Sequence, residues 1–213
     1  MNLTPVMQKT EDPAAGALPG NGRAAGTASP SRPGLLAFTG TGPGDAALLT
    51  LRAAELIGEA DMVVGSAQLT AQVAHLVPEA AAVVETSQDG ADIPALISAV
   101  QAGRIVVRLC PGDPLLFGQA AAEADACARA AIPLEIVPGM PAATAVPAYA
   151  GLPLTSDTTT DLRVVHASEL SREAAEFQAS SSLVILGAEA KPVDLAKMLM
   201  AAGWADTTPM AIT

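Results

Sequence analysis

Three Pro-Gly pairs each follow an apolar run in this chain, and their backbones could build a binding site. Pro43-Gly44 follows "LLAFTGTG", Pro111-Gly112 follows "RIVVRLC" and Pro138-Gly139 follows "LEIV". Because proline donates no backbone hydrogen bond and glycine permits close approach, such turns leave polar main-chain groups open to a ligand. If the runs are parallel strands, the turns lie at carboxyl ends and share one edge of a sheet. We therefore expect a cleft lined by main-chain carbonyls and amides.

The first two turns each carry an aspartate, Asp45 and Asp113. Carboxylates beside open carbonyls favour a cationic or zwitterionic ligand over a phosphate. The segment "GTGPGD" has Gly40 and Gly42 of the dinucleotide motif G-x-G-x-x-G, but Asp45 stands where the third glycine is required. The chain has no Walker motif either. A second interpretation stays open, because aspartate in such a turn often only caps the next helix.

Strand and helix patterns alternate along most of the chain. Apolar runs predict strands at 35–39, 61–65, 82–86, 104–110 and 134–138. Helical periodicity predicts helices at 51–58 (with Thr50 as the N-cap), 67–77, 92–103 and 118–131. This alternation predicts an α/β fold, with a mainly parallel sheet covered by helices on both faces.

The chain divides into three parts. Residues 1–33 are rich in Pro, Gly, Ala, Thr and Ser and lack periodicity, which predicts a disordered tail. An N-terminal α/β lobe is expected at 34–150. A partial C-terminal α/β lobe is expected at 151–213, with strands at 162–167, 181–187 and 208–213 and helices at 171–177 and 193–203. Because so few strands are too thin a layer to close a core, we expect this lobe to be truncated and the chain to be a fragment.

The buried face of the last predicted helix is expected to be formed by Val193, Ala196, Leu199 and Met200.

The amino-acid composition disfavours several classes of function. The chain has 213 residues with a formal net charge of −11, which disfavours a nucleic-acid partner. Cys110 and Cys127 form no C-x-x-C pair, so we expect reduced thiols, no disulfide scaffold and no metal site. The first 33 residues contain no apolar h-region, so we expect no signal peptide there, and no apolar run is long enough to span a bilayer. We expect a soluble, cytoplasmic protein with a small-molecule partner and no membrane partner.

Three motifs together resemble the tetrapyrrole methylase family: "GTGPGDAALLTLRAAELIGEADMVV", "VVRLCPGDPLLFG" and "EIVPGMPAATAVPAYAGLPLT". The resemblance runs from about residue 34 to the end and is strongest to the uroporphyrinogen-III C-methyltransferases of that family. It implies a two-lobed fold and S-adenosylmethionine-dependent methylation of a tetrapyrrole towards precorrin-2, in the biosynthesis of the porphyrin-derived cofactors sirohaem and cobalamin. It also implies a possible homodimer and, in some relatives, a downstream uroporphyrinogen-III synthase domain.

The resemblance assigns cofactor contacts to residues of all three turns and of two later strands. The positions that match the family's cofactor-contacting residues are Pro43, Gly112, Asp113, Leu116, Ala142, Leu186 and Ala211. The sulfonium of S-adenosylmethionine is a cation, and carbonyl oxygens at strand ends are suitable neighbours for it.

The chain also departs from the family pattern. Gly65-Ser66 stands where the family has Tyr-Asp with the proposed proton acceptor, and "VVETSQ" lacks an expected lysine. Leu186 replaces a methionine, and "PLTSD" lacks two basic residues. We therefore assign no catalytic residue. Arg108 is expected either to contact a substrate carboxylate or simply to extend its charged end to water.

Two other functions stay open. One is methylation of a corrin-type ring by the same fold, and the other is a non-catalytic domain that keeps the cofactor pocket. A ribosomal-RNA methylase of this fold is disfavoured by the net charge.

Overall fold

The computed structural model describes residues 33–86, 90–118, 120–169, 181–187, 191–208 and 210. The first sheet has five strands in the order β3-β2-β4-β1-β5. They are β1 (Leu35–Gly40), β2 (Met62–Gly65), β3 (Ala82–Glu85), β4 (Ile105–Cys110) and β5 (Leu134–Val137). Every pairing in this sheet is parallel, so the predicted parallel α/β fold is confirmed.

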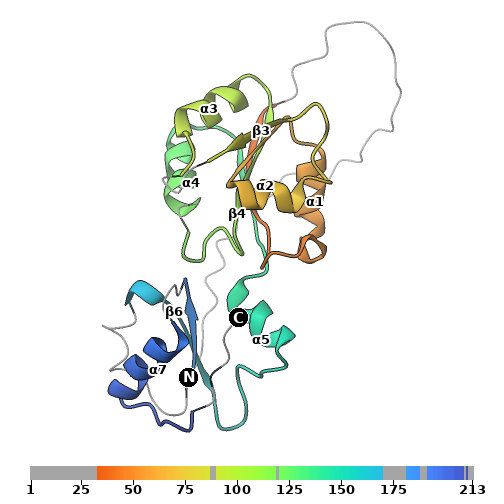
Figure 1. Ribbon diagram of the computed structural model, residues 1–213. Helices are drawn as coiled ribbons and strands as arrows, with labels where there is room; N and C mark the ends of the chain where they lie inside the picture. The colour runs from red at the N-terminus through yellow and green to blue at the C-terminus, as the bar shows by residue number, and fades with distance from the viewer. Residues whose placement is uncertain are drawn as a thin grey trace, which may run out of the picture. The chain divides into compact units, whose positions relative to one another are not determined.

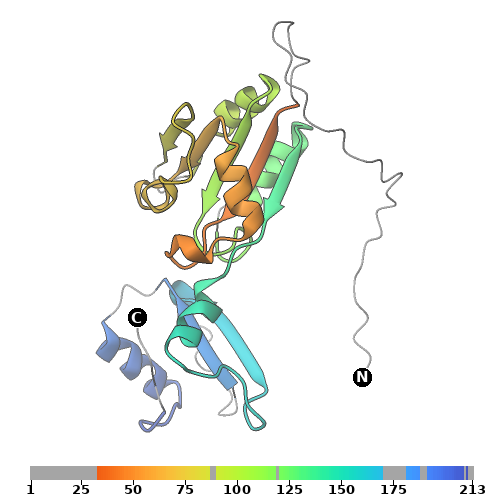
Figure 2. The same cartoon turned by 90° about the vertical axis from the view of Figure 1, so that its right-hand side faces the viewer.

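Helices cover both faces of this sheet, as the alternation predicts. They are α1 (Leu51–Gly58), α2 (Ala67–Val73), α3 (Ile93–Gln101) and α4 (Ala120–Arg129). Leu36 and Phe38 of β1 are fully buried in the core layer that contains residues of α3 and α4. Ala37, between them in β1, is buried in the opposite layer with residues of α1 and α2. Figures 1 and 2 show these helices around the strands from two directions.

Side-chain caps set where helices α1 and α3 begin. The Oγ1 of Thr50 accepts a hydrogen bond from the Ala53 amide at 3.2 Å, so the predicted N-cap of α1 is confirmed. Asp92 caps α3 by accepting from the Ala95 amide at 3.2 Å. These bonds satisfy amides that would otherwise lack a partner in the first turn of the helix.

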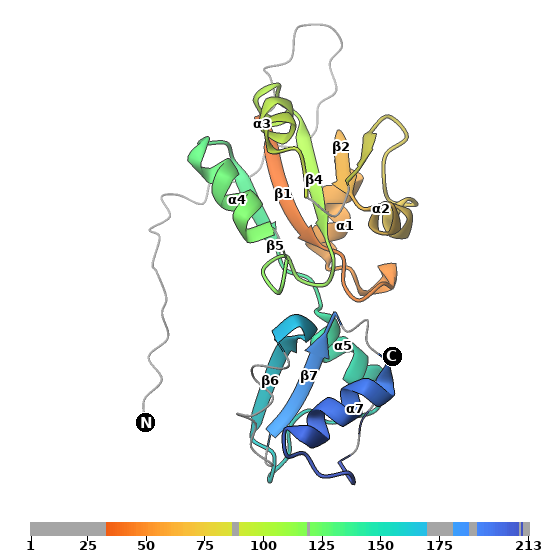
Figure 3. The same ribbon diagram turned by 60° about the vertical axis from the view of Figure 1, so that its left-hand side comes forward.

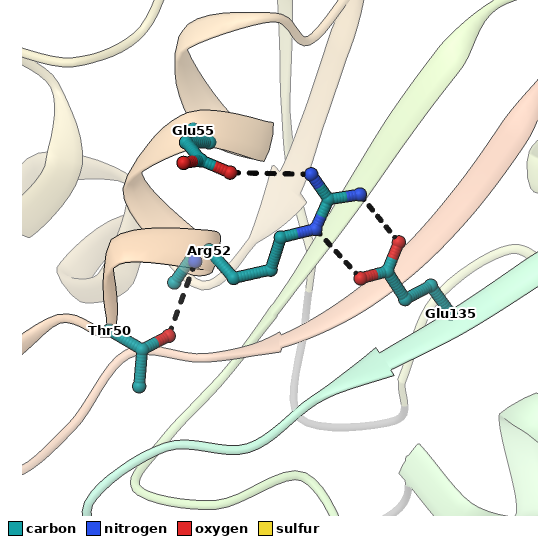
Figure 4. Close-up of polar contacts among 5 residues, drawn as sticks. Thr50, Arg52, Glu55 and Glu135 are labelled. Carbon is teal, nitrogen blue, oxygen red and sulfur yellow. Dashed lines mark hydrogen bonds and ion pairs between the residues drawn. The ribbon is translucent and has the colours of Figure 1, made fainter. Parts of the chain in front are cut away.

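A bidentate ion pair connects helix α1 to the edge strand β5. The Nε and Nη2 atoms of Arg52 donate to the two carboxylate oxygens of Glu135, each at 2.8 Å. The Nη1 of Arg52 also lies 3.4 Å from the carboxylate of Glu55, one turn further along α1 (Figure 4). The guanidinium thus joins two elements that are far apart in the sequence.

A second, two-stranded parallel sheet consists of β6 (Asp161–His166) and β7 (Ser181–Leu186). The remaining described helices are α5 (Ala142–Tyr149), α7 (Pro192–Ala201) and the short 3-10 helices η1 (Ala46–Leu48) and η2 (Ala167–Glu169). Figure 3 shows β6 and β7 side by side, with α5 and α7 beside them. Val165 of β6 and Leu195 of α7 are the buried centre of this unit.

The predicted buried face of the last helix is wrong in part. Val193 and Met200 are 62% and 51% exposed, whereas Leu195 is only 7% exposed. Helix α7 carries two apolar stripes, and helical periodicity alone does not decide which of them faces the sheet. The packed stripe is that of Leu195 and Leu199.

Other parts of the structure were not predicted from the sequence, and some predictions lie outside the described residues. Helix α5 is not among the helices predicted from the sequence, and Pro147 inside it lacks a backbone donor. The predicted helix at 171–177 lies outside the described residues, as do residues 1–32 and most of the predicted strand at 208–213. The boundaries of the two lobes stay predictions. Among the described residues, no helix is both long and apolar enough to cross a membrane.

Candidate functional site: three turns at one sheet edge

The strand order makes β1 and β4 neighbours, although their connections run in opposite directions. The chain passes beyond β4 on its way from β1 to β2, and beyond β1 on its way from β4 to β5, with α1 and α4 on opposite faces of the sheet. In open parallel sheets, such a point has a crevice at the carboxyl ends of the two strands. This is where open parallel sheets bind ligands.

The first two Pro-Gly turns are hydrogen-bonded to each other across this crevice. The Gly112 amide donates to the Gly42 carbonyl at 3.0 Å, and the Gly42 amide donates to the Gly112 carbonyl at 3.3 Å. Both glycines have a left-handed backbone, with φ of 74° and 59°. Because side chains disfavour that conformation, glycine is required for this bridge.

The third turn packs against the other two. The Gly139 amide donates to the Oδ2 of Asp113 at 3.2 Å. A Cβ atom on Gly40 would lie 2.6 Å from the Gly139 Cα, and one on Gly139 would overlap the Gly112 carbonyl oxygen. The three backbones therefore meet with no room for a side chain. The expectation that the turns gather at one edge of the sheet is confirmed.

The two turn aspartates serve the turns themselves. The Oδ1 of Asp45 accepts from the Ala47 amide at 2.8 Å and caps η1. The Oδ1 of Asp113 accepts from the Leu115 amide at 2.9 Å, while its other oxygen holds Gly139. Of the two interpretations that the sequence leaves open, the structure favours capping and turn closure.

A pocket of about 480 Å³ opens beside the first two turns. One wall is formed by Gly42, Pro43 and Gly44 of the first turn and by Pro111 and Gly112 of the second.

Helix α2 supplies a polar wall of the same pocket. Ser66, Gln68 and Gln72 line it together with Thr86, which follows β3. The Nε2 of Gln72 donates to the Thr41 carbonyl at 2.8 Å and so ties α2 to the loop after β1. Sequence reasoning missed the two glutamines; their spacing of one helical turn is the only signal for them.

Arg108 of β4 also lines the pocket, but it already has a partner. Its Nε and Nη2 donate to the two carboxylate oxygens of Glu123 at 2.9 and 3.1 Å, and its Nη1 donates to the Leu109 carbonyl at 2.7 Å. The Glu123 carboxylate in turn accepts from the Ala91 amide at 3.1 Å. Both residues are buried, at 9% and 7% exposure. Arg108 therefore does not extend to water, and its guanidinium is held by the protein.

Ser66 is the N-cap of α2, and its Oγ accepts from the Leu69 amide at 3.4 Å. It stands where the resemblance leads one to expect the proton-accepting aspartate. A serine hydroxyl that caps a helix, with no base among its described contacts, is a weak proton acceptor. The structure thus offers no reason to assign Ser66 a catalytic role.

The seven predicted cofactor contacts are only partly brought together. Pro43, Gly112 and Ala142 line the pocket, and Asp113 shapes the second turn. Leu116 is half-buried in the loop after β4 and does not line the pocket. Their role as cofactor contacts stays a prediction.

The last two predicted contacts belong to the later part of the chain. Leu186 ends β7, where it pairs with His166. Ala211 lies outside the described residues. Within the part of the chain that the structure describes, no group of three or more His, Cys, Asp and Glu side chains could hold a metal ion.

Comparison with known protein families shows which family this chain belongs to. The family model described as "Tetrapyrrole (Corrin/Porphyrin) Methylases" matches residues 35–213. The chain belongs to this tetrapyrrole methylase family. The match includes all three turns and both sheets.

Named relatives of this chain include siroheme synthases. Siroheme synthase 1 of Klebsiella pneumoniae is 34% identical over 193 residues, covering 84% of this chain and 41% of that protein. Siroheme synthase 1 of Yersinia enterocolitica is 35% identical, with the same coverage. The chain thus spans about two fifths of the length of these relatives.

Solved structures agree with the fold. The uroporphyrin-III C-methyltransferase of Thermus thermophilus, complexed with S-adenyl homocysteine, is 30% identical with a TM-score of 0.67; the match covers 81% of this chain and 74% of that one. A cobalt precorrin-4 methyltransferase has a TM-score of 0.70 at 24% identity, covering 80% of this chain and 76% of that one. This second likeness supports the fold alone.

Proposed function

We propose that this chain catalyses the S-adenosylmethionine-dependent C-methylation of uroporphyrinogen-III towards precorrin-2, a precursor of sirohaem and cobalamin. The observation that carries the proposal is the pocket that the bridged turns after β1 and β4 line together with helix α2. Family membership and the similarity to the Thermus enzyme support it. A cytoplasmic homodimer is part of the same proposal.

The turns fit a sulfonium cofactor. The bridge holds the backbones of the first two turns side by side, and a Cβ atom on Gly40 or Gly139 would collide with the neighbouring turn. Carbonyl oxygens are favourable neighbours for a cation, and the one cation among the described lining residues, Arg108, is paired with Glu123. We propose that Pro43, Gly112 and Ala142 contact the cofactor, with Leu116, Leu186 and Ala211, while Asp113 holds the second turn in shape.

Bound S-adenosylmethionine would supply an electrophilic methyl group to a nucleophilic pyrrole carbon. The contribution of this chain is then mainly to hold the two reactants in line and to exclude water. The rigid bridge between Gly42 and Gly112 suits that positioning role. Ser66 is not assigned to the removal of the ring proton, since it is committed to capping α2.

Calorimetry with S-adenosylmethionine, followed by a methylation assay on uroporphyrinogen-III, tests the proposal. We expect binding and transfer of labelled methyl groups to the tetrapyrrole. Absence of cofactor binding would refute the proposal. Methylation of a corrin-type precursor but not of uroporphyrinogen-III would move the substrate to the corrin class.

A second candidate is a non-catalytic domain that binds the same ligands. The observation that favours it is Ser66, which caps a helix at the position where the resemblance leads one to expect an acidic proton acceptor. Cofactor binding without any turnover, measured on the same samples, would support this candidate. Introducing the acid as Ser66→Asp would then be expected to raise methyl transfer, since aspartate can cap α2 as well.

A further inference from the structure

The second sheet ends with a histidine whose ring is fixed in place. His166 is the last residue of β6 and pairs with Leu186, the last residue of β7. A Cβ atom on Gly187, which follows β7, would overlap the Nε2 of His166. Gly187 also has a left-handed backbone, with φ of 69°, so glycine is required there twice over. The Nε2 edge of the imidazole is therefore packed against the backbone after β7.

The other edge of the imidazole contacts Ser168. The backbone amide of Ser168 donates to the Nδ1 of His166 at 3.3 Å. Because an amide N–H can only donate, Nδ1 holds a lone pair, and the neutral ring carries its proton on Nε2. The Oγ of Ser168 lies 2.9 Å from the same Nδ1, so the hydroxyl also donates to it. Ser168 and His166 thus form a hydroxyl–base pair within reach of proton transfer.

This pair lies close to the pocket that we assign to the cofactor. Phe117 lines that pocket, and its ring centroid is 6.0 Å from that of His166. The backbone of Phe117 is left-handed, with φ of 53°, which is costly for a bulky side chain and is typical of functional sites. Ser168 itself is exposed, so a bound substrate can reach its hydroxyl.

We propose that Ser168 and His166 take up the proton that the tetrapyrrole loses on methylation. The inference rests on the proposed function. A ring carbon forms a bond to the methyl group, the bond from that methyl group to sulfur breaks, and its electron pair stays on sulfur. The substrate proton passes to the Oγ of Ser168 as the hydroxyl proton passes to the Nδ1 of His166. The resulting imidazolium then releases its proton to water.

Replacing the base without removing the turn tests His166. The hydrogen bond from the Ser168 amide needs only an acceptor at position 166, whereas proton transfer needs a basic one. In His166→Asn the carboxamide oxygen can accept from that amide, as asparagine does in turns, but it takes up no proton near neutral pH. We expect methyl transfer to fall about a hundredfold. Cofactor affinity by calorimetry should stay within about threefold of wild type.

His75→Asn is the matched control. His75 is exposed after α2, and its replacement should leave both methyl transfer and cofactor affinity unchanged.

Removing the hydroxyl tests Ser168 and leaves every backbone hydrogen bond in place, so it remains informative if His166→Asn fails to fold. Ser168→Ala should also lower methyl transfer about a hundredfold. Ser98→Ala, at an exposed position of α3 where the hydroxyl donates to the Pro94 carbonyl, should have no effect. The double variant of Ser168 and His166 should lose no more than the larger single loss, because the two side chains act as one unit.

Nitrogen NMR of the histidine rings provides a readout that does not depend on activity. Two-bond proton–nitrogen correlation spectra should show His166 with its proton on Nε2 and an unprotonated Nδ1. The exposed His75 serves as the reference within the same chain. A neutral His166 with its proton on Nδ1 would overturn the proposed route.

Other outcomes separate this inference from the proposed function. A wild type that methylates uroporphyrinogen-III, with His166→Asn or Ser168→Ala equally active, would overturn the inference and leave the proposed function intact. So would a loss of methyl transfer matched by an equal loss of cofactor affinity, since that would indicate a structural role. A wild type that binds the cofactor but methylates no tetrapyrrole would refute both.

Discussion

Gly40, Gly112 and Gly139 come from the ends of three different strands, and a Cβ atom on Gly40 or Gly139 would collide with the backbone of the neighbouring turns. This close contact allows the first two turns to bridge and brings the third against Asp113. The shape of the site is therefore set by the backbone. The absence of a side chain at Gly40 and at Gly139 is what allows this backbone contact.

Gly139→Ala should accordingly disrupt the site. The new Cβ would overlap the Gly112 carbonyl, and relieving that overlap should cost about 1–3 kcal/mol of unfolding free energy. Thermal unfolding and cofactor titration would measure the loss of stability and of affinity together.

Gly58→Ala is the matched control. A Cβ there meets nothing closer than the Leu76 carbonyl at 4.0 Å, and the residue lies at the end of helix α1. We expect it to be neutral or slightly stabilising, since alanine favours a helix over glycine. If both variants behaved alike, the three-glycine contact would not be what shapes the site.

Glu123 shows which site residues a sequence pattern can reveal. Ala120, Glu123, Ala124 and Cys127 share one helical face, and all four are buried. An acidic residue on an otherwise apolar face needs a buried partner. That much could be predicted, but the identity of the partner, Arg108, depends on how α4 packs on β4.

At the level of elements, α1 is held to β5 by Arg52 and Glu135 (Figure 4). The hydrogen bonds from Arg52 lower the pKa of the Glu135 carboxyl below its usual range. A carboxyl whose pKa is lowered by folding stabilises the fold above its unfolded pKa. That contribution is lost as the pH falls through the folded pKa.

Glu135→Gln should therefore lower stability slightly at neutral pH and have less effect in acid. The effect is small because both partners are partly exposed, and exposed ion pairs contribute little. Urea unfolding at a series of pH values would show the two proteins converging below about pH 4.3, the ordinary pKa of glutamate. A constant difference down to lower pH would contradict the role assigned to this ion pair.

Helix α7 gives a second prediction at this scale. Leu195 is buried against the sheet of β6 and β7, so Leu195→Ala should cost about 2–3 kcal/mol. Val193 is mostly exposed, and Val193→Ala should change stability by less than about 0.5 kcal/mol. Denaturant titration of both variants would also reveal which apolar stripe of α7 is packed; a larger effect at Val193 would reverse the assignment.

Across the first sheet, both cysteines lie in the same core layer, between the strands and helices α3 and α4. Burial raises the pKa of the Cys110 thiol to about 12 and also raises that of Cys127. Because the thiolate is the reactive form, we expect both to react very slowly with a thiol reagent at pH 8 in the folded protein.

The rate of that reaction should rise with denaturant in step with the opening of the sheet. A Cys127→Ser variant would separate the two thiols. Rapid modification of one thiol per chain without denaturant would show that this core layer opens independently of the rest.

The strands, the main helices and the position of the three turns could be predicted from the sequence. Apolar periodicity, helix caps and Pro-Gly pairs act between residues a few positions apart, so a short window of sequence contains the relevant physics. The same local rules did not predict α5, which contains Pro147, and for α7 they assigned Val193 and Met200 to the buried face although both are exposed.

Contacts between distant residues were decided by packing. Arg108 and Glu123 are 15 positions apart, Gln72 and Thr41 are 31 apart, and each pair meets because of the strand order and the faces the helices cover. A short stretch of sequence does not determine which face of the sheet a helix covers. The positions of the turns therefore follow from local chemistry, while the ion pair between Arg108 and Glu123 exists only once α4 lies against β4.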